Sequence, residues 1–240
     1  MAWGTAPGLC LEKQAAPGDH GPDLTPNERR GMRHWKLFTA PMSRGLPCQW
    51  LLEEVGAPYE VERLDIFGGE TRSEAYREIH PLGAIPALTV DGVPVFESVA
   101  ICLYLADAAQ EALAPPLDDP QRPIYLQWMV YAVATLEPKI SAPFVRSLSA
   151  PSSGRKEAAT PEERRAFELV LEPLREGIER GHLLPDGFSA ADIMVGVQLY
   201  WASLVGLTRT APWTDAYLNG LMSRPAFVRA HRDYLSTGGD

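Results

Sequence analysis

The stretch IPALTVDGVPVFES (85–98) constrains the fold of this chain more than any other feature. Two short runs rich in apolar and β-branched residues flank Asp91-Gly92, a dipeptide that favours the two-residue turn of a β-hairpin. We therefore predict a hairpin here. The stretch SVAICLYLADAA (98–109) is predicted to form a helix directly after the second strand.

The residues before this hairpin alternate between strand and helix patterns. A short apolar run at 34–40 and a stretch with β-branched and aromatic residues at 59–66 predict two strands. A helix is predicted at 48–56, where Gly56 is a typical C-terminal cap, and a weaker one at 73–80. The order β-α-β-α-β-β-α is the thioredoxin-like arrangement, a βαβ unit with parallel strands followed by a ββα unit.

The pattern changes after residue 109. The proline-rich stretch 110–117 indicates a linker, and no strand alternation follows it, so we predict an all-α domain over 118–240. Residues on one stripe of a long helix in this domain recur at helical spacing, with further residues that widen the stripe: Ile124, Trp128, Tyr131 and Thr135, then Tyr125, Met129, Val133 and Leu136.

Two more helices have clear start signals. Thr160 begins one of them as an N-cap with glutamate at the third helical position, and Pro173 should kink that helix. The stretch FSAADIMVGVQLYWASLVGL (188–207) begins with a capping box formed by Ser189 and Asp192. It is apolar on every side, which predicts a buried central helix.

Residues 1–31 are rich in Pro, Gly and charge, so we predict a flexible tail ahead of a thioredoxin-like domain over 32–109. The tail lacks the basic start and apolar core of a secretory signal. The net charge of −9 disfavours nucleic acid as a partner, and no apolar run reaches the roughly 18 residues of a membrane span. Three cysteines without a CxxC motif disfavour a disulfide scaffold and a metal site and favour a reducing cytoplasm.

Three motifs in this order resemble the cytosolic glutathione transferase superfamily. HPLGAIPAL (80–88) is similar to that family's loop before a cis-proline, Glu97-Ser98 to its γ-glutamyl-binding pair, and FSAAD (188–192) to its capping box. The resemblance extends from roughly Arg33 to the C-terminus. It implies a homodimeric, cytoplasmic enzyme of detoxification that transfers alkyl or aryl groups, with glutathione as co-substrate, a small hydrophobic electrophile as the other substrate, and no metal.

The resemblance also assigns roles in binding glutathione. Ile85-Pro86 is expected to be cis, with the Ile85 backbone pairing with the cysteinyl backbone of glutathione like an added strand. Ser98 is expected to cap a helix whose N-terminus favours the α-carboxylate, and Glu97 to accept a hydrogen bond from the α-amino group. From the residues alone, a trans strand start and a simple helix cap remain alternatives. His80 is expected to form a hydrogen bond within its loop.

The thiol of glutathione needs activation, because an unperturbed thiol has a pKa near 8.5. Phe38 and Thr39 lie where some classes of the family use tyrosine, so Ser43 in the following turn, which resembles the serine of SPxSR-type bacterial members, is our candidate. Its alternative role is that of an N-cap. Arg44 is expected to add charge or bind a carboxylate, with Thr39 as a second donor. Cys48 lies inside the next helix, and we predict that it is a core residue, like Cys102.

The electrophile pocket is expected between the turn at 39–44 and the first helix of the second domain. Its aromatic and apolar candidates fit an ordinary core equally well: Tyr125, Trp128, Met129, Tyr131 and Trp201. Two alternative functions remain open. The same glutathione site serves isomerases, dehalogenases and peroxidases, and a member that has lost catalysis acts as a binding or scaffold protein.

Overall fold

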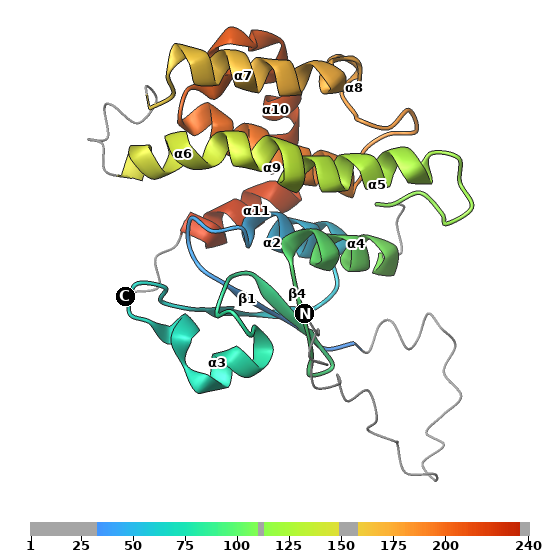
Figure 1. The fold of residues 1–240 in the computed structure, drawn as a ribbon. Helices are drawn as coiled ribbons and strands as arrows, with labels where there is room; N and C mark the ends of the chain where they lie inside the picture. Colours follow the sequence, from blue (N-terminus) through green and yellow to red (C-terminus); the bar gives the residue numbers. More distant parts are fainter. Residues whose placement is uncertain (1–32, 110–112, 149–157, 236–240) are drawn as a thin grey trace, which may run out of the picture. The chain divides into compact units, whose positions relative to one another are not determined.

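The computed structural model describes residues 33–109, 113–148 and 158–235 (Figure 1). The predicted tail, the first residues of the predicted linker and Cys10 lie outside these ranges. The described residues up to 109 form an α/β domain, and all elements from residue 122 onward are helical. This order confirms the predicted fold class.

The α/β domain is built on a sheet with the strand order β2-β1-β3-β4. β1 (Trp35–Thr39) is parallel to β2 (Tyr59–Arg63) and antiparallel to β3 (Ala87–Val90), which pairs with β4 (Val93–Phe96). Both residues of the turn between β3 and β4 have positive φ, 51° and 82°, as a type I′ turn requires. The predicted hairpin and the predicted parallel pair are therefore both confirmed.

Helices cover both faces of this sheet (Figure 1). α2 (Leu46–Val55) and α4 (Ser98–Ala108) pack against each other between the sheet and the C-terminal helices, whereas α3 (Glu74–Ile79) lies on the opposite face. α2 ends at Gly56 with φ of 69°, a left-handed conformation that glycine adopts without steric cost, as the sequence predicts. A short 3-10 turn, η1 (Glu70–Arg72), precedes α3.

A long helix opens the helical part and contains a π-helical turn. α5 (Arg122–Tyr131) continues through η2 (Ala132–Leu136) into α6 (Glu137–Leu148). Pro138 has no N–H, and its ring crowds the carbonyl four residues earlier, in the middle of η2. The wider π turn accounts for how the helix passes this proline, and such turns frequently mark functional sites.

The buried face of this long helix differs in part from the predicted stripe. Tyr125, Met129 and Leu136 are fully buried, whereas Ile124 is 44% exposed. The prediction placed Ile124 on the apolar stripe, and this was wrong. The packing of the long helix against α9 turns the neighbouring row of residues inward instead.

The remaining helices pack around one buried helix. The capping box of Thr160 is present, as predicted. Pro173 was expected to kink the helix that follows; it lies instead in a 3-10 turn that divides this stretch into two helices. The elements are α7 (Pro161–Leu171), η4 (Glu172–Leu174), α8 (Arg175–Arg180), α9 (Ala190–Leu204), η5 (Leu207–Thr210), η6 (Pro212–Thr214), α10 (Asp215–Met222) and α11 (Pro225–Leu235). α9 is buried from its first residue to Ala202, which confirms the predicted central helix. In the part of the chain that the structure describes, no helix is long and apolar enough to cross a membrane.

Asp192 connects the start of α9 to two neighbouring segments. One carboxylate oxygen accepts hydrogen bonds from the Leu183 N–H and the Tyr217 hydroxyl, both at 2.8 Å. The other accepts from the Ser189 N–H at 2.8 Å, which completes the predicted capping box. Asp192 has no exposed surface, so water cannot replace its carboxylate as the acceptor for these donors.

We expect Asp192→Ala to lower the free energy of unfolding by about 3 kcal/mol, because it leaves several buried donors without a partner. Urea unfolding followed by circular dichroism measures this loss. Asp215→Ala is the matched control, since Asp215 is an exposed aspartate in the first turn of α10 and should cost less than about 1 kcal/mol. Equal losses in both variants would contradict a special role for Asp192.

Candidate functional site

Three segments of the α/β domain meet at one end of the sheet. The ladders of β3 with β1 and with β4 both end at Ala87. The next residues along the three strands, Thr39, Pro86 and Glu97, therefore lie next to each other. This register brings the turn after β1, the loop before β3 and the start of α4 together.

The loop before β3 is fixed by side chains of its own neighbourhood. The Ile85-Pro86 bond is cis, as predicted. The Tyr76 hydroxyl donates a hydrogen bond to the Ala84 carbonyl at 2.7 Å, and burial raises the pKa of Tyr76 to about 12, so the hydroxyl keeps its proton. His80 accepts a hydrogen bond from a main-chain N–H two residues later at 3.3 Å, which confirms the bond expected within this loop.

The start of α4 differs by one residue from the prediction. Ser98 is the first helical residue, and Glu97 occupies the N-cap position with no side-chain capping bond. Glu97 has φ of 74°, a conformation that is rare for any residue but glycine. The chain turns into the helix at this residue, one position before the predicted N-cap Ser98. Backbone outliers of this kind cluster at functional sites. Glu97 is exposed, and Ser98 is 9% exposed.

The turn after β1 places the Ser43 hydroxyl just before α2. Its oxygen donates to the Ala40 carbonyl at 2.6 Å and accepts from the Gly45 N–H at 3.2 Å. Thr39 Oγ1 lies 3.5 Å from Ser43 Oγ, but Thr39 is only 3% exposed. Of the two hydroxyls considered from the sequence, Ser43 is therefore the one with access to a ligand.

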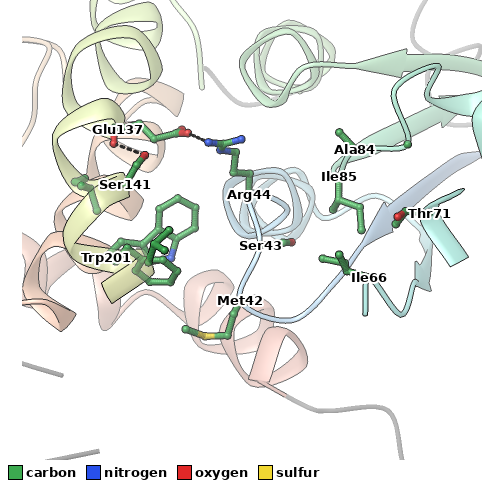
Figure 2. A pocket seen from close by; sticks show the side chains of 14 residues that line it. Met42, Ser43, Arg44, Ile66, Thr71, Ala84, Ile85, Glu137, Ser141 and Trp201 are labelled. Atoms are coloured by element: carbon green, nitrogen blue, oxygen red, sulfur yellow. Dashed lines mark hydrogen bonds and ion pairs between the residues drawn. The ribbon is translucent and has the colours of Figure 1, made fainter. Parts of the chain in front are cut away.

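A pocket of about 430 Å³ lies between the α/β domain and the helices α6 and α9 (Figure 2). Its wall contains Ser43, Arg44 and Ile85 from the predicted site residues. The other predicted site residues, Thr39, Pro86, Glu97 and Ser98, are not part of this wall. The complete wall consists of Met42, Ser43, Arg44, Ile66, Thr71, Gly83, Ala84, Ile85, Glu137, Ile140, Ser141, Phe144, Val145 and Trp201.

An ion pair joins the two sides of the pocket. Arg44 points from the turn after β1 toward Glu137 at the start of α6, and their side chains form a salt bridge (Figure 2). Glu137 is 13% exposed in its side chain, and its second oxygen accepts a hydrogen bond from Gln198 Nε2 at 3.4 Å. Glu137 is not among the site residues predicted from the sequence.

The pocket wall on the helical side differs from most of the predicted candidates. Trp201 is part of the wall, but Tyr125 and Met129 are fully buried core residues. Trp128 and Tyr131 pack against each other, with ring centroids 5.5 Å apart, and neither lines the pocket. The predicted candidates on the first half of the long helix do not line the pocket, because this helix faces the pocket with its second half, after the π turn.

A helical stripe in that second half supplies the wall instead. The four residues of α6 next to Glu137 in the wall follow it at helical spacing: Ile140, Ser141, Phe144 and Val145. This spacing was visible in the sequence and is the signal that could have found them. Most of the side chains are apolar, so the wall favours an apolar ligand.

Cys48 and Cys102 are core residues, as predicted. Both are fully buried, with sulfur atoms 3.8 Å apart, and Cys48 Sγ lies 3.7 Å from the Ser98 carbonyl. Burial raises the pKa of the Cys48 thiol, which keeps it protonated and unreactive. In the described ranges, no three His, Cys, Asp or Glu side chains gather in a group that would hold a metal ion.

The comparison with known families concerns the α/β domain. Residues 34–107 match the family model of the glutathione S-transferase N-terminal domain. Glutathione S-transferase 3 of Schizosaccharomyces pombe is 35% identical over 108 residues, which are 45% of this chain and 44% of that protein. The chain therefore spans less than half of this relative.

Other relatives match over most of their length. A glutathione S-transferase of Arabidopsis thaliana is 26% identical over 80% of this chain and 90% of its own. Maleylacetoacetate isomerase of Dictyostelium discoideum is 26% identical over 76% of this chain and 88% of its own. The crystal structure of a glutathione transferase from Phanerochaete chrysosporium in complex with oxidized glutathione has a TM-score of 0.70 at 24% identity, covering 85% of this chain and 97% of that one. The chain is therefore similar to glutathione transferases along most of its length, and the likeness to the solved structure is one of fold.

We expect Gly45→Ala to disturb the turn that carries Ser43. A Cβ atom at Gly45 would lie 1.8 Å from Thr39 Oγ1, so Thr39 or the turn must move. The free energy of unfolding in urea should fall by about 2 kcal/mol. Gly220→Ala is the matched control, because a Cβ on this helical glycine of α10 meets nothing within 4 Å. Unchanged stability of Gly45→Ala would show that Thr39 gives way freely.

Proposed function

We propose that this chain is a member of the glutathione transferase superfamily that activates the thiol of glutathione at Ser43 for attack on a small hydrophobic electrophile. The observation that carries the proposal is the position of Ser43 in the wall of a largely apolar pocket, opposite helix α6. A conjugating enzyme needs a donor to the thiolate directly beside the cavity that holds the second substrate. We further propose a cytoplasmic role in detoxification.

Glutathione is proposed to bind along the end of the sheet where β3 begins. The β3–β4 ladder stops before Ile85, which supports the proposal that the Ile85 backbone pairs with the cysteinyl backbone of the tripeptide. Ser98 lies at the N-terminus of α4, where free N–H groups favour the γ-glutamyl carboxylate, and Glu97 would accept from the α-amino group. Pro86, directly after Ile85, is proposed to hold the loop before β3 in its binding conformation. Arg44 is proposed as a further contact with glutathione.

The proposed activation is a hydrogen bond from Ser43 to the thiolate. In the structure the hydroxyl donates to the Ala40 carbonyl, and a rotation about its Cβ–Oγ bond would redirect the proton to the sulfur. The Gly45 N–H, which donates to the same oxygen, would strengthen Ser43 as a donor. Thr39 is a second candidate whose burial argues against it.

Isomerisation is the second candidate function, because one relative is named maleylacetoacetate isomerase. Dehalogenation and peroxide reduction would use the same glutathione site, and a scaffold protein would use none of its chemistry. Retention on immobilised glutathione together with turnover of chloronitrobenzenes supports conjugation. Retention without turnover of any electrophile, keto acid or peroxide would support a binding protein instead.

We expect Ser43→Ala to raise the pKa of the thiol of bound glutathione toward its free value. One pKa unit corresponds to about 1.4 kcal/mol, so a loss of two units slows conjugation at neutral pH roughly a hundredfold. The absorbance of the thiolate, followed against pH with glutathione bound, measures this change. Ser223→Ala is the matched control, because Ser223 is exposed and its hydroxyl also donates to the carbonyl three residues earlier, at 2.8 Å.

Two outcomes would contradict the role of Ser43. An unchanged titration in Ser43→Ala together with a raised thiol pKa in Thr39→Ala would transfer the role to Thr39. An unchanged titration in both variants would leave Arg44 or main-chain amides as the activating groups. Glutathione affinity should change little in Ser43→Ala, because Ile85 and Ser98 are proposed to hold other parts of the tripeptide.

We also expect a homodimer, as in the family that the sequence resembles. Leu126 and Val130 lie four residues apart on α5 and are 38% and 50% exposed, which is an apolar surface that a second copy would cover. Light scattering at micromolar concentration should give twice the mass of one chain, and Val130→Glu should shift it toward the monomer. Val228→Glu on α11, with 52% exposure, is the matched control. A wild-type monomer would contradict this expectation.

A further inference from the structure

The charges in the pocket wall suggest how the site discriminates among electrophiles. Among the described residues of the wall there is one cation, Arg44, and one anion, Glu137, and the two form an ion pair. We propose that Glu137 sets the charge selectivity of this pocket: it neutralises Arg44, so that uncharged electrophiles are accepted and carboxylate-bearing ones are disfavoured. This inference rests on the proposed function, because it takes the pocket as the electrophile site.

Glu137 is the fixed partner of the pair. Its side chain is 13% exposed and is held by Gln198 as well as by Arg44, whereas the Arg44 side chain is 58% exposed. Glu137 also begins α6 directly after the π turn η2, so its backbone belongs to a continuous helix. The carboxylate therefore has little freedom to leave the pocket, and Arg44 is drawn to it.

The pocket is small enough for the charges of Arg44 and Glu137 to act on a ligand at any position inside it. A cavity of about 430 Å³ is comparable in width to the Debye length of about 8 Å at physiological ionic strength, so a charge on its wall acts on a ligand anywhere inside it. The apolar wall around Phe144 and Trp201 lowers the effective dielectric constant further. An anionic ligand would lose hydration here and meet the Glu137 carboxylate, while the attraction of Arg44 is already used.

The paired charges of the pocket wall discriminate between the two candidate reactions. Maleylacetoacetate, the substrate in the name of one relative, carries two carboxylates. The described wall of this pocket offers such a substrate no cation that is not already paired. Glu137 therefore favours conjugation of uncharged aromatic or alkyl electrophiles over isomerisation of a dianion.

The test compares two unreactive ligands that differ in one carboxylate, 1,3-dinitrobenzene and 3,5-dinitrobenzoate. Isothermal titration into the full-length protein at neutral pH gives the ratio of their dissociation constants. The wild type should bind the uncharged ligand more tightly. In Glu137→Gln the ratio should shift about tenfold in favour of the anion, a change of about 1.4 kcal/mol.

Two further variants bracket this result. Arg44→Gln leaves the Glu137 carboxylate without its cation, so the ratio should move in the opposite direction, further against the anion. Glu53→Gln is the matched control, because Glu53 is 20% exposed in its side chain and pairs with Arg229 at 2.5 Å outside the pocket wall. It should leave the ratio as in the wild type.

The outcomes separate this inference from the proposed function. An unchanged ratio in Glu137→Gln, or tight binding of the anion by the wild type, would overturn the inference. If Glu137→Gln does not fold, as judged by its melting temperature, the direction of the shift in Arg44→Gln decides. A wild type that binds neither ligand also overturns the inference. Turnover of an uncharged chloronitrobenzene with glutathione tests the proposed function independently, because the binding ratio requires no reaction.

Discussion

The antiparallel pairing of β3 with both of its neighbours is the constraint on which the candidate site depends. Because both ladders end at Ala87, the residues just beyond them on three different segments are brought to one end of the sheet. A shift of the register by one residue would turn every side chain of β3 to the other face and move Ile85 away from the turn that carries Ser43. The hairpin turn at Asp91-Gly92 prevents such a shift, since its two positive φ angles fix the loop length.

Packing of α2 carries this arrangement into the helical part. α2 contacts α4, α9 and α11, and Trp50 on α2 is almost fully buried with its ring 4.9 Å from that of Phe227 on α11. Arg224, directly before α11, adds an ion pair to Glu54 of α2 at 2.6 Å. The turn with Ser43 immediately precedes α2, so the same contacts that join the two parts also set the position of the proposed donor beside α6.

The polar groups of the pocket are few, and each has a structural origin. Ser43 belongs to a turn closed by its own hydrogen bonds, Arg44 follows it directly, and Glu137 begins the helix that resumes after the π turn. The remaining wall is largely apolar. Such a site recognises its second substrate mainly by shape and by the absence of unpaired charge. Of the proposed glutathione contacts, Ser43, Arg44 and Ile85 belong to this wall, whereas Glu97 and Ser98 at the start of α4 lie outside it.

Local patterns in the sequence were sufficient to predict the order of helices and strands and several segments of the candidate site. The Asp91-Gly92 turn, the capping boxes at Thr160 and Ser189 and the proline in the loop before β3 each depend on neighbouring residues alone, and all lie where they were predicted. Tertiary structure decided which faces met. Ile124 was exposed rather than buried, and Glu137 came to Arg44 from 93 residues away in the chain. Only the packing of α6 against α9, and of α9 against α2 and α4, selects which half of the long helix lines the pocket.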